Sequence, residues 1–404
     1  MTSHPDIHGM VGSHCSAAGG VHNAVDEAVR LGLDCVQVFT KNQRQWSAPA
    51  LTDEAVRLFR DAVARAGWDD LPQRVVSHNS YLVNLASPDA ELRRKSIASQ
   101  RDELERCEAL GIVWSVAHPG AHLGAPRPPK SPNTLRAEPS ADERAGLERI
   151  AASLDEIHRS LKGCRAVTCL ETTTGSGTNL GYDFRHLRII RDLVKEPERV
   201  AYCLDTCHIV SAGYDLSDDA AARATLEECR ATCGRDLLKV LHVNDSKSPP
   251  GSRVDRHEHI GHGTCGMACF RAIMTAPDLR MVPKILETEK ADDPSGRPWD
   301  AVNAERLRAI LSPQGEGGPA PRRTPSADGT KRSSAGAAAR SDDAPPAPTK
   351  RSTKASASSD KAAAKPATKT IAKATAEATA KATRGATPVA TSKASSKAST
   401  KRAR

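Results

Sequence analysis

Eight short runs of apolar residues recur along the first 311 positions, and an amphipathic segment follows each one. Short apolar runs bounded by turn residues are typical of fully buried parallel strands. They predict strands near residues 7–12, 34–39, 73–77, 112–117, 166–171, 200–205, 238–243 and 283–287. The segments between them have helical periodicity, and several carry helix-capping residues at their ends. Eight strand–helix units predict an α/β fold, a (β/α)₈ TIM barrel, rather than an open doubly wound sheet.

Histidine and carboxylate side chains follow most of these apolar runs. The nine residues concerned are His78, His118, Glu171, Asp205, His208, His242, Asp255, His257 and Glu287. Active sites of TIM barrels lie at the carboxyl ends of the strands, so we expect these groups to converge. Taken singly, each could be a helix cap, a charge at the barrel mouth or a hydrogen-bonded structural histidine. Together they include four carboxylates, whose mutual repulsion calls for divalent cations such as Zn²⁺ or Mn²⁺.

The number of these groups indicates more than one metal ion. Nine ligands exceed the needs of one tetrahedral zinc, whereas two or three metals that share carboxylates would use them all. The pattern therefore predicts a multi-metal hydrolase, in which metal-bound water supplies hydroxide at neutral pH. The remaining histidines are expected to lie outside the cluster: His4, His8, His14, His22, His122, His158, His186, His259 and His262.

Charge is divided unevenly along the chain. The 404 residues carry a formal charge of +9, whereas residues 313–404, with 19 Lys and Arg against 6 Asp and Glu, carry +13, which leaves −4 for residues 1–312. The C-terminal segment consists mainly of Ala, Lys, Ser, Thr and Pro, and every aromatic residue lies at or before Trp299. Such a segment cannot bury enough apolar surface to offset the entropy of ordering it. We therefore predict a catalytic domain at residues 1–311 and a disordered basic tail at residues 312–404.

Cysteine usage and hydropathy favour a cytoplasmic location. The eleven cysteines are odd in number and include no CxxC pair, which argues against a disulfide framework. The N-terminal residues MTSHPDIHGM lack the pattern of a signal peptide, and no segment has 18 consecutive apolar residues. We therefore expect a protein of the reducing cytoplasm that has no membrane partner.

Eight segments follow one another in a fixed order: SAAGGVHNA, VFTKNQRQW, SHNSYLVNLASP, HPGAHLG, ETTTGSGTNLG, LDTCHIVSAGYDL, HVNDSKSPPGSRVDRHEHIGHG and ILET. Together they resemble the endonuclease IV family of abasic-site DNA repair enzymes, from about residue 8 to about residue 311. The resemblance implies a TIM-barrel hydrolase of the deoxyribonuclease IV type with three zinc ions. Such an enzyme cleaves duplex DNA 5′ to an abasic site and leaves a 3′-hydroxyl and a 5′-deoxyribose phosphate. A monomer associated with the nucleoid is expected.

The same resemblance implies roles for individual residues. One zinc would be held by His78, His118 and Glu171. Glu171 would bridge to a second zinc, bound also by Asp205, His242 and Glu287. The third zinc would take His208, Asp255 and His257, and Mn²⁺ could occupy one of the sites. Glu171 and Glu287 would be the catalytic residues.

Three further residues look like the family's DNA contacts. Arg44 resembles a side chain inserted into the duplex, and Tyr81 with Leu82 resembles the pair that fills the gap left by a flipped-out sugar and its partner. Extruding a nucleotide leaves a stacking hole, which an aromatic–aliphatic wedge and a guanidinium can fill. Without the resemblance, barrel packing for Tyr81 and Leu82 and a solvated loop charge for Arg44 would be open alternatives.

Three positions depart from the family pattern: Asn79 where an acid is expected, Thr172 where Asn is frequent, and His262 where Glu is common. None belongs to the nine ligands, so we expect activity to survive, with changes confined to metal affinity or rate. The Pro-rich loop at residues 122–144 and the basic tail also lie outside the pattern.

Two other functions remain open at this stage. A metal-dependent sugar isomerase or epimerase can use the same barrel, but it needs fewer metals and gives no reason for Arg44, Tyr81 and Leu82. A non-catalytic DNA-binding protein would not need an intact set of nine ligands. The tail would bind DNA phosphates without sequence preference and in a salt-dependent way, or it would only keep the protein soluble.

Overall fold

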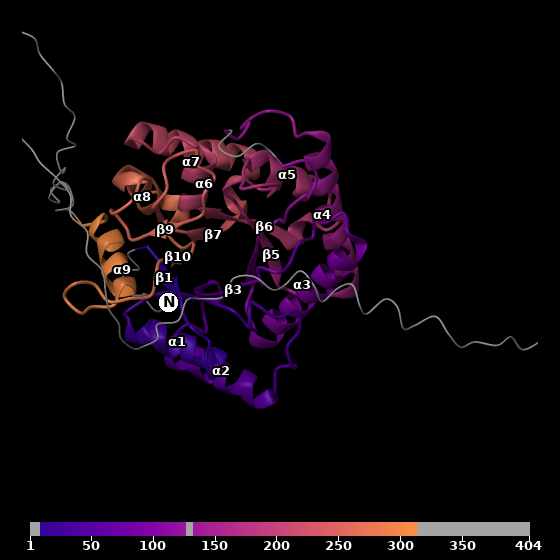
Figure 1. Cartoon of the computed structure of the whole chain (residues 1–404). Coiled ribbons are helices and arrows are strands. Elements are labelled where there is room, and N and C mark those ends of the chain that lie inside the picture. The colour runs from indigo at the N-terminus through magenta and orange to yellow at the C-terminus, as the bar shows by residue number, and fades with distance from the viewer. Residues whose placement is uncertain (1–8, 127–131, 313–404) are drawn as a thin grey trace, which may run out of the picture. The chain divides into compact units, whose positions relative to one another are not determined.

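The computed structural model describes residues 9–126 and 132–312. Within these residues, eight parallel strands close into a barrel, and in Figure 1 they lie at the centre of a ring of helices. The strands are β1 (Val11–His14), β2 (Cys35–Val38), β3 (Val75–His78), β4 (Trp114–Ala117), β5 (Val167–Glu171), β6 (Val200–Asp205), β7 (Leu238–His242) and β10 (Lys284–Leu286). The predicted TIM barrel is confirmed, whereas the expected disordered tail lies outside the described residues.

The first strand lies later in the sequence than predicted. The pattern favoured residues 7–12, but β1 begins at Val11 because Gly12 pairs with Cys35 of β2 and Ile285 of β10 in the closed barrel. A Cβ atom at position 12 would lie only 2.1 Å from the Cys35 carbonyl oxygen, so glycine is needed where these strands approach. The shift places His14 at the carboxyl end of β1, beside the other strand ends.

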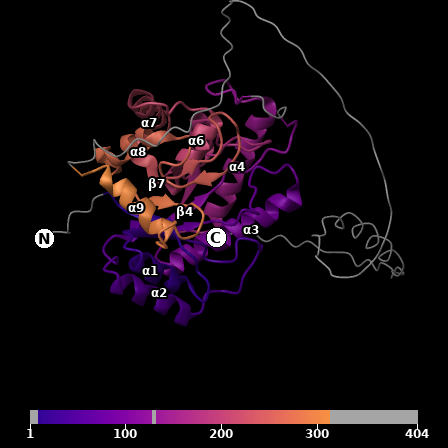
Figure 2. The ribbon, with the colours of Figure 1, turned by 60° about the vertical axis from the view of Figure 1, so that its left-hand side comes forward.

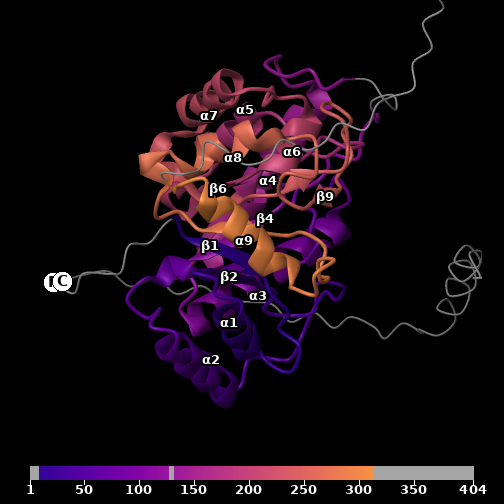
Figure 3. The same ribbon diagram turned by 90° about the vertical axis from the view of Figure 1, so that its left-hand side faces the viewer.

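Helices cover the outside of the barrel, and Figures 2 and 3 show α1 and α2 side by side, as in Figure 1. They are α1 (Val21–Arg30), α2 (Asp53–Arg65), α3 (Ala90–Leu110), α4 (Ala141–Ser160), α5 (Phe184–Leu193), α6 (Thr206–Ala212), α7 (Asp219–Cys233), α8 (Gly266–Met274) and α9 (Trp299–Ala309). Short 3₁₀ turns occupy Pro72–Arg74, Pro197–Arg199, Arg235–Leu237 and Pro277–Leu279. Ser140 and Glu143 form a capping box that starts α4.

A short helix and a two-stranded sheet were not predicted. The short helix α6 begins directly after β6, and a small antiparallel pair, β8 (Asp245–Ser246) and β9 (His257–Glu258), follows β7. Both are too short to give a periodic hydrophobic signal. They matter because they carry three of the nine candidate ligands past the strand ends.

The core has two layers. One cluster fills the barrel interior and comprises Met10, Cys35, Val76, Val116, Cys169, Ala201, Cys203, Val240 and Ile285, and a larger one lies between strands and helices. All eleven cysteines fall within the described residues and are free, as expected for a chain without a disulfide framework. No helix in the described part of the chain is long and apolar enough to cross a membrane.

Candidate metal centre

Nine His, Asp and Glu side chains meet at the carboxyl end of the barrel. Strands β3, β5, β6 and β7 end in His78, Glu171, Asp205 and His242, while His118 and Glu287 directly follow β4 and β10. Of the other three, His208 lies in α6, Asp255 lies in the chain just before β9, and His257 is the first residue of β9. Their ligand atoms form three groups, and in each group the atoms lie within 4.8 Å of one another.

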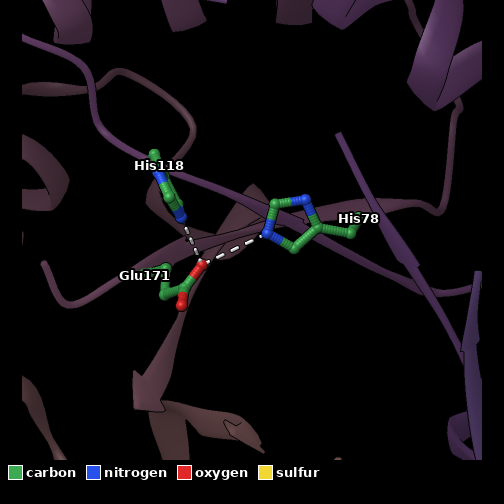
Figure 4. Close-up of side chains that lie close together, drawn as sticks. All are labelled: His78, His118 and Glu171. Carbon is green, nitrogen blue, oxygen red and sulfur yellow. Dashed lines mark hydrogen bonds and ion pairs between the residues drawn. The ribbon is translucent and has the colours of Figure 1, made fainter. Parts of the chain in front are cut away.

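The first group comprises His78, His118 and Glu171. Figure 4 shows both imidazoles directed at one oxygen of Glu171, with Nε2 of His78 at 3.3 Å and Nε2 of His118 at 3.0 Å from Oε2. The His78 ring is oriented by its other nitrogen, since Nδ1 donates a 2.7 Å hydrogen bond to the carbonyl of Asn79. This bond leaves the Nε2 lone pair free for a metal.

The second group comprises Glu171, through its other oxygen, with Asp205, His242 and Glu287. His242 Nδ1 is 2.9 Å from Glu171 Oε1, 3.1 Å from Glu287 Oε2 and 3.8 Å from Asp205 Oδ2. Gln37 fixes the His242 tautomer, because its Oε1 accepts a 2.8 Å hydrogen bond from Nε2. The Glu171 carboxylate therefore has one oxygen in each of the two groups, which is the geometry of a bridging ligand.

The third group comprises His208, Asp255 and His257. Nε2 of His208 is 3.2 Å from Asp255 Oδ2, and Nε2 of His257 is 3.4 Å from Asp255 Oδ1. The other ring nitrogens are held by backbone carbonyls, at 2.7 Å from Thr172 and 3.1 Å from Glu287. Among the described residues both Nε2 atoms are buried without a hydrogen-bond partner. A buried imidazole nitrogen that faces a carboxylate without a hydrogen bond fits a metal ion between them.

The electrostatics of the cluster also favour bound positive charge. Burial by itself would raise the pKa of Glu171, but the His242 and His118 imidazoles outweigh it and hold this pKa well below its usual range. Burial would lower the pKa of His208, but the carboxylates of Asp205, Asp255 and Glu171 raise this pKa well above the usual value. Buried carboxylates that raise the pKa of neighbouring imidazoles create a negative potential that is consistent with a site for divalent cations.

Comparisons with known proteins place this centre in a family. Residues 25–310 match the family model described as a xylose isomerase-like TIM barrel. The chain is 39% identical over 302 residues to the probable endonuclease 4 of Geobacter sp. (strain M21), with 75% of this chain and 99% of that protein covered. The chain belongs to the endonuclease IV family. The resemblance seen in the sequence, and the hydrolase class that it implied, are confirmed.

Solved structures agree with this membership. The crystal structure of endonuclease IV from Thermus thermophilus matches with a TM-score of 0.61 and 34% identity, over 75% of this chain and 98% of that one. A D-tagatose 3-epimerase-like protein matches with a TM-score of 0.53 and 17% identity, over 74% of this chain and 97% of that one. At this identity the likeness shows only a common barrel, so it does not favour a sugar epimerase.

The sequence analysis missed two residues that touch the centre of this endonuclease IV family member. His14 was expected to lie outside the cluster, but its Nδ1 is 3.3 Å from Oε1 of Glu287. Gln37 donates a 2.7 Å hydrogen bond to the same oxygen. The signal for His14 was present, because the segment VGSH matches the strand-end segment VVSH that includes His78. The sequence did not indicate a role for Gln37, because it is a single polar residue within an apolar run and does not stand at the end of a strand.

A thiol also lies at the edge of the third group. The Sγ of Cys207 lies with ligand atoms of Asp205 and His257 within 4.8 Å. Burial raises the pKa of this thiol to about 12, and its Sγ donates to the carbonyl of Arg256 at 3.6 Å. Because its Sγ is engaged with that carbonyl, we leave Cys207 outside the proposed ligand set.

Two of the three residues that depart from the family pattern make hydrogen bonds next to the metal centre. Asn79 is buried and its amide donates to Gln100 Oε1. Thr172 accepts a 2.9 Å hydrogen bond from the backbone of Asp205 through Oγ1. His262, in contrast, is exposed and packs edge-on against Trp299 at a ring distance of 5.3 Å. None of the three belongs to a ligand group.

The residues expected to contact DNA line the same mouth of the barrel. Arg44 is exposed in the loop between β2 and α2. Tyr81 is 59% exposed although its ring lies 5.8 Å from that of His118, so it projects from the edge of the metal centre. Beside it is a cavity of about 240 Å³, lined by both Tyr81 and Leu82 together with His78 and His118. An exposed aromatic ring at the rim of a metal site suits contact with a substrate better than core packing.

Proposed function

We propose that this endonuclease IV family member hydrolyses the phosphodiester 5′ to an abasic site in duplex DNA. Family membership supports it, and one observation carries it: nine ligand-type side chains converge in three groups, two of which share Glu171. In the reaction a water oxygen bonds to phosphorus, the bond between phosphorus and O3′ breaks, and a proton reaches O3′. The products are a 3′-hydroxyl and a 5′-deoxyribose phosphate.

Three zinc ions are proposed, one for each group. The first would be bound by His78, His118 and Glu171; the second by Glu171, Asp205, His242 and Glu287; and the third by His208, Asp255 and His257, with Mn²⁺ an alternative at one site. Imidazole and carboxylate are common zinc ligands, and the mixture also accepts manganese. When bound, such ions lower the pKa of water and neutralise charge on the phosphodiester.

The chain's own residues fix this geometry. Glu171, a proposed catalytic residue, would hold two ions at a set spacing through its two oxygens. Glu287, the second, is itself oriented by hydrogen bonds from Gln37 and His14 to one oxygen, which leaves the other free to bind. Hydrogen bonds to the second ring nitrogen hold four of the five imidazoles, those of His78, His208, His242 and His257, in the tautomer that a metal requires.

The DNA would meet this centre through the loops around it. Arg44 would enter the duplex at the lesion, and Tyr81 with Leu82 would fill the space left by the extruded nucleotide. An abasic nucleotide costs less to extrude than a paired one, which is a source of selectivity. We propose that the protein acts as a monomer on chromosomal DNA in the cytoplasm.

Two measurements test this function together. Elemental analysis of protein purified without chelator should give two or three zinc ions per chain, and the loaded protein should cut a duplex oligonucleotide once, 5′ to a single tetrahydrofuran abasic analogue. A matched intact duplex and a ketohexose serve as controls. Less than one metal per chain would refute the cluster, whereas a loaded protein that epimerises the sugar and leaves the oligonucleotide whole would favour the isomerase alternative.

A further inference from the structure

The loop between β2 and α2, residues 39–52, is anchored to α3 at its first end. The side chain of Lys41 is 2% exposed, and its Nζ donates to Oδ2 of Asp102 at 2.6 Å and to the carbonyl of Ser99 at 2.8 Å. The neighbouring Thr40 hydroxyl donates a 2.9 Å hydrogen bond to Oε1 of Glu103. A buried ammonium held by a carboxylate and a carbonyl leaves this end of the loop little freedom.

The second end is anchored to the same helix by Arg106. Its Nη2 donates to the carbonyls of Ala48 and Pro49, and its Nε donates to Oδ2 of Asp102 at 3.0 Å. Asp102 therefore accepts from Lys41 at one end of the loop and from Arg106 at the other. Burial would raise the pKa of Asp102, but its two cationic partners outweigh burial and lower it, so the carboxylate stays charged.

The tip of the loop is tied to the chain that follows β3. Asn42 Oδ1 accepts a 2.9 Å hydrogen bond from the backbone of Arg44. The Ser80 hydroxyl donates a 2.7 Å hydrogen bond to the Gln43 carbonyl and accepts one of 3.2 Å from the backbone of Leu82. The backbone that carries Arg44 is thus joined through one hydroxyl to the backbone that carries Tyr81 and Leu82.

We propose that Asp102 is a positioning residue for lesion recognition, because it fixes both ends of the loop that presents Arg44. This inference rests on the proposed function, in which Arg44 contacts DNA. Buried ion pairs add little net stability. The pairs of Asp102 with Lys41 and Arg106 are therefore better explained by the loop conformation that they fix. A loop ordered before binding loses less conformational entropy when DNA arrives, and a displacement of about 1 Å can cost a large factor in a recognition step.

The test is Asp102→Asn in the full chain, which keeps the shape but removes the charge shared by Lys41 and Arg106. Its Kd for abasic duplex should rise about tenfold, while metal content and the Kd for intact duplex change much less. Trypsin should also cut after Arg44 faster in this variant, a readout that needs neither DNA nor metal. Glu105→Gln, an exposed carboxylate on the same helix paired loosely with Arg101 at 3.8 Å, is the matched control and should behave as the parent chain.

A double variant separates the inference from the function on which it rests. In an Arg44→Ala background, Asp102→Asn should add less than about twofold, because the residue it positions is gone. If Arg44→Ala weakens abasic binding but Asp102→Asn does not, or if their effects add fully, the positioning role is wrong and the proposed function stands. If Arg44→Ala itself has no effect, the DNA contact is wrong and the positioning role fails with it. Should Asp102→Asn not fold, Arg106→Gln releases one end of the loop alone and is expected to give the same pattern.

Discussion

Glu171 has one carboxylate oxygen among the imidazoles of His78 and His118 and the other beside His242. Its side chain is fully buried, so its charge is not screened by water. A neutral amide in its place would direct an NH₂ group at one set of imidazoles. Loss of this single charge therefore affects two of the three groups at once.

We expect Glu171→Gln to reduce incision of abasic duplex by at least about 10²-fold, since it removes charge stabilisation at the reacting phosphate. Affinity for the same duplex should largely remain, because the proposed DNA contacts are unchanged. Single-turnover cleavage and fluorescence anisotropy measure the two effects. Glu289→Gln, an exposed carboxylate two residues beyond Glu287, is the control and should cut normally. Cleavage near the parent rate by Glu171→Gln would remove Glu171 from the catalytic centre.

Tyr81→Ala should weaken binding to abasic duplex by about 1–3 kcal/mol, the scale of one lost stacking contact between a base and an aromatic ring. Binding to intact duplex should change less, because no extruded nucleotide leaves a gap there. Tyr81→Phe keeps the ring and should retain most of the affinity. Titration of both duplexes with each variant makes the comparison, and an equal loss on both would identify Tyr81 as a residue of the fold.

At the scale of elements, the chain after β7 is organised by one carboxylate. Asp245 in β8 is buried and accepts four backbone hydrogen bonds, each of 2.9 Å, from Ser246, Gly261, Gly263 and Cys265. These bonds fold residues 258–265 back onto β8, and pairing of β8 with β9 then places His257 near Asp205. The third ligand group thus depends on a hairpin rather than on a barrel strand.

Asp245→Asn should lower the free energy of unfolding by about 1–3 kcal/mol, because an amide cannot accept all four bonds and leaves buried N–H groups unpaired. Metal content should fall by up to about one ion per chain, since the third group loses its support. Chemical denaturation and elemental analysis measure these effects. Asp293→Asn is the control, as Asp293 also accepts backbone N–H groups but lies in an exposed loop. A destabilised variant with full metal content would limit Asp245 to the fold.

At the scale of the whole molecule, the charge distribution opposes DNA binding by the catalytic part. Residues 1–312 carry −4, whereas residues 313–404 carry +13. Attraction to DNA must then come from positive charge at the mouth of the barrel, including bound cations, or from the basic residues 313–404. Residues 313–404 lie outside the described part of the chain, so DNA binding by this basic segment stays a prediction.

Truncation after Leu311 should leave a folded protein with its metals, because every strand within residues 9–126 and 132–312 and every proposed ligand precedes that point. Turnover of a short abasic oligonucleotide at saturating concentration should be nearly unchanged. Affinity for long intact DNA at low salt should fall, and the slope of log affinity against log salt should become shallower, because fewer lysines release counterions. The full chain is the reference. An unchanged slope would refute DNA capture by the tail and leave a solubilising role.

The sequence determined the architecture and the chemistry of this protein. Short apolar runs alternating with amphipathic segments are local patterns, so they predicted the eight barrel strands and their covering helices. The nine candidate ligand residues could be recognised in the sequence because barrel topology brings the carboxyl ends of all strands to one rim, whatever the details of packing. The long motifs that indicated the family also lie at or after these strand ends, where the candidate ligands are.

Only the tertiary structure decided which atoms meet. His14 and Glu287 are separated by 273 positions, and no local pattern could place their side chains 3.3 Å apart. The start of β1 was set by its two neighbouring strands, and the tautomer of His242 was set by Gln37. Contacts of this kind depend on strand register and on short elements held by a few hydrogen bonds, which no periodicity in the sequence records.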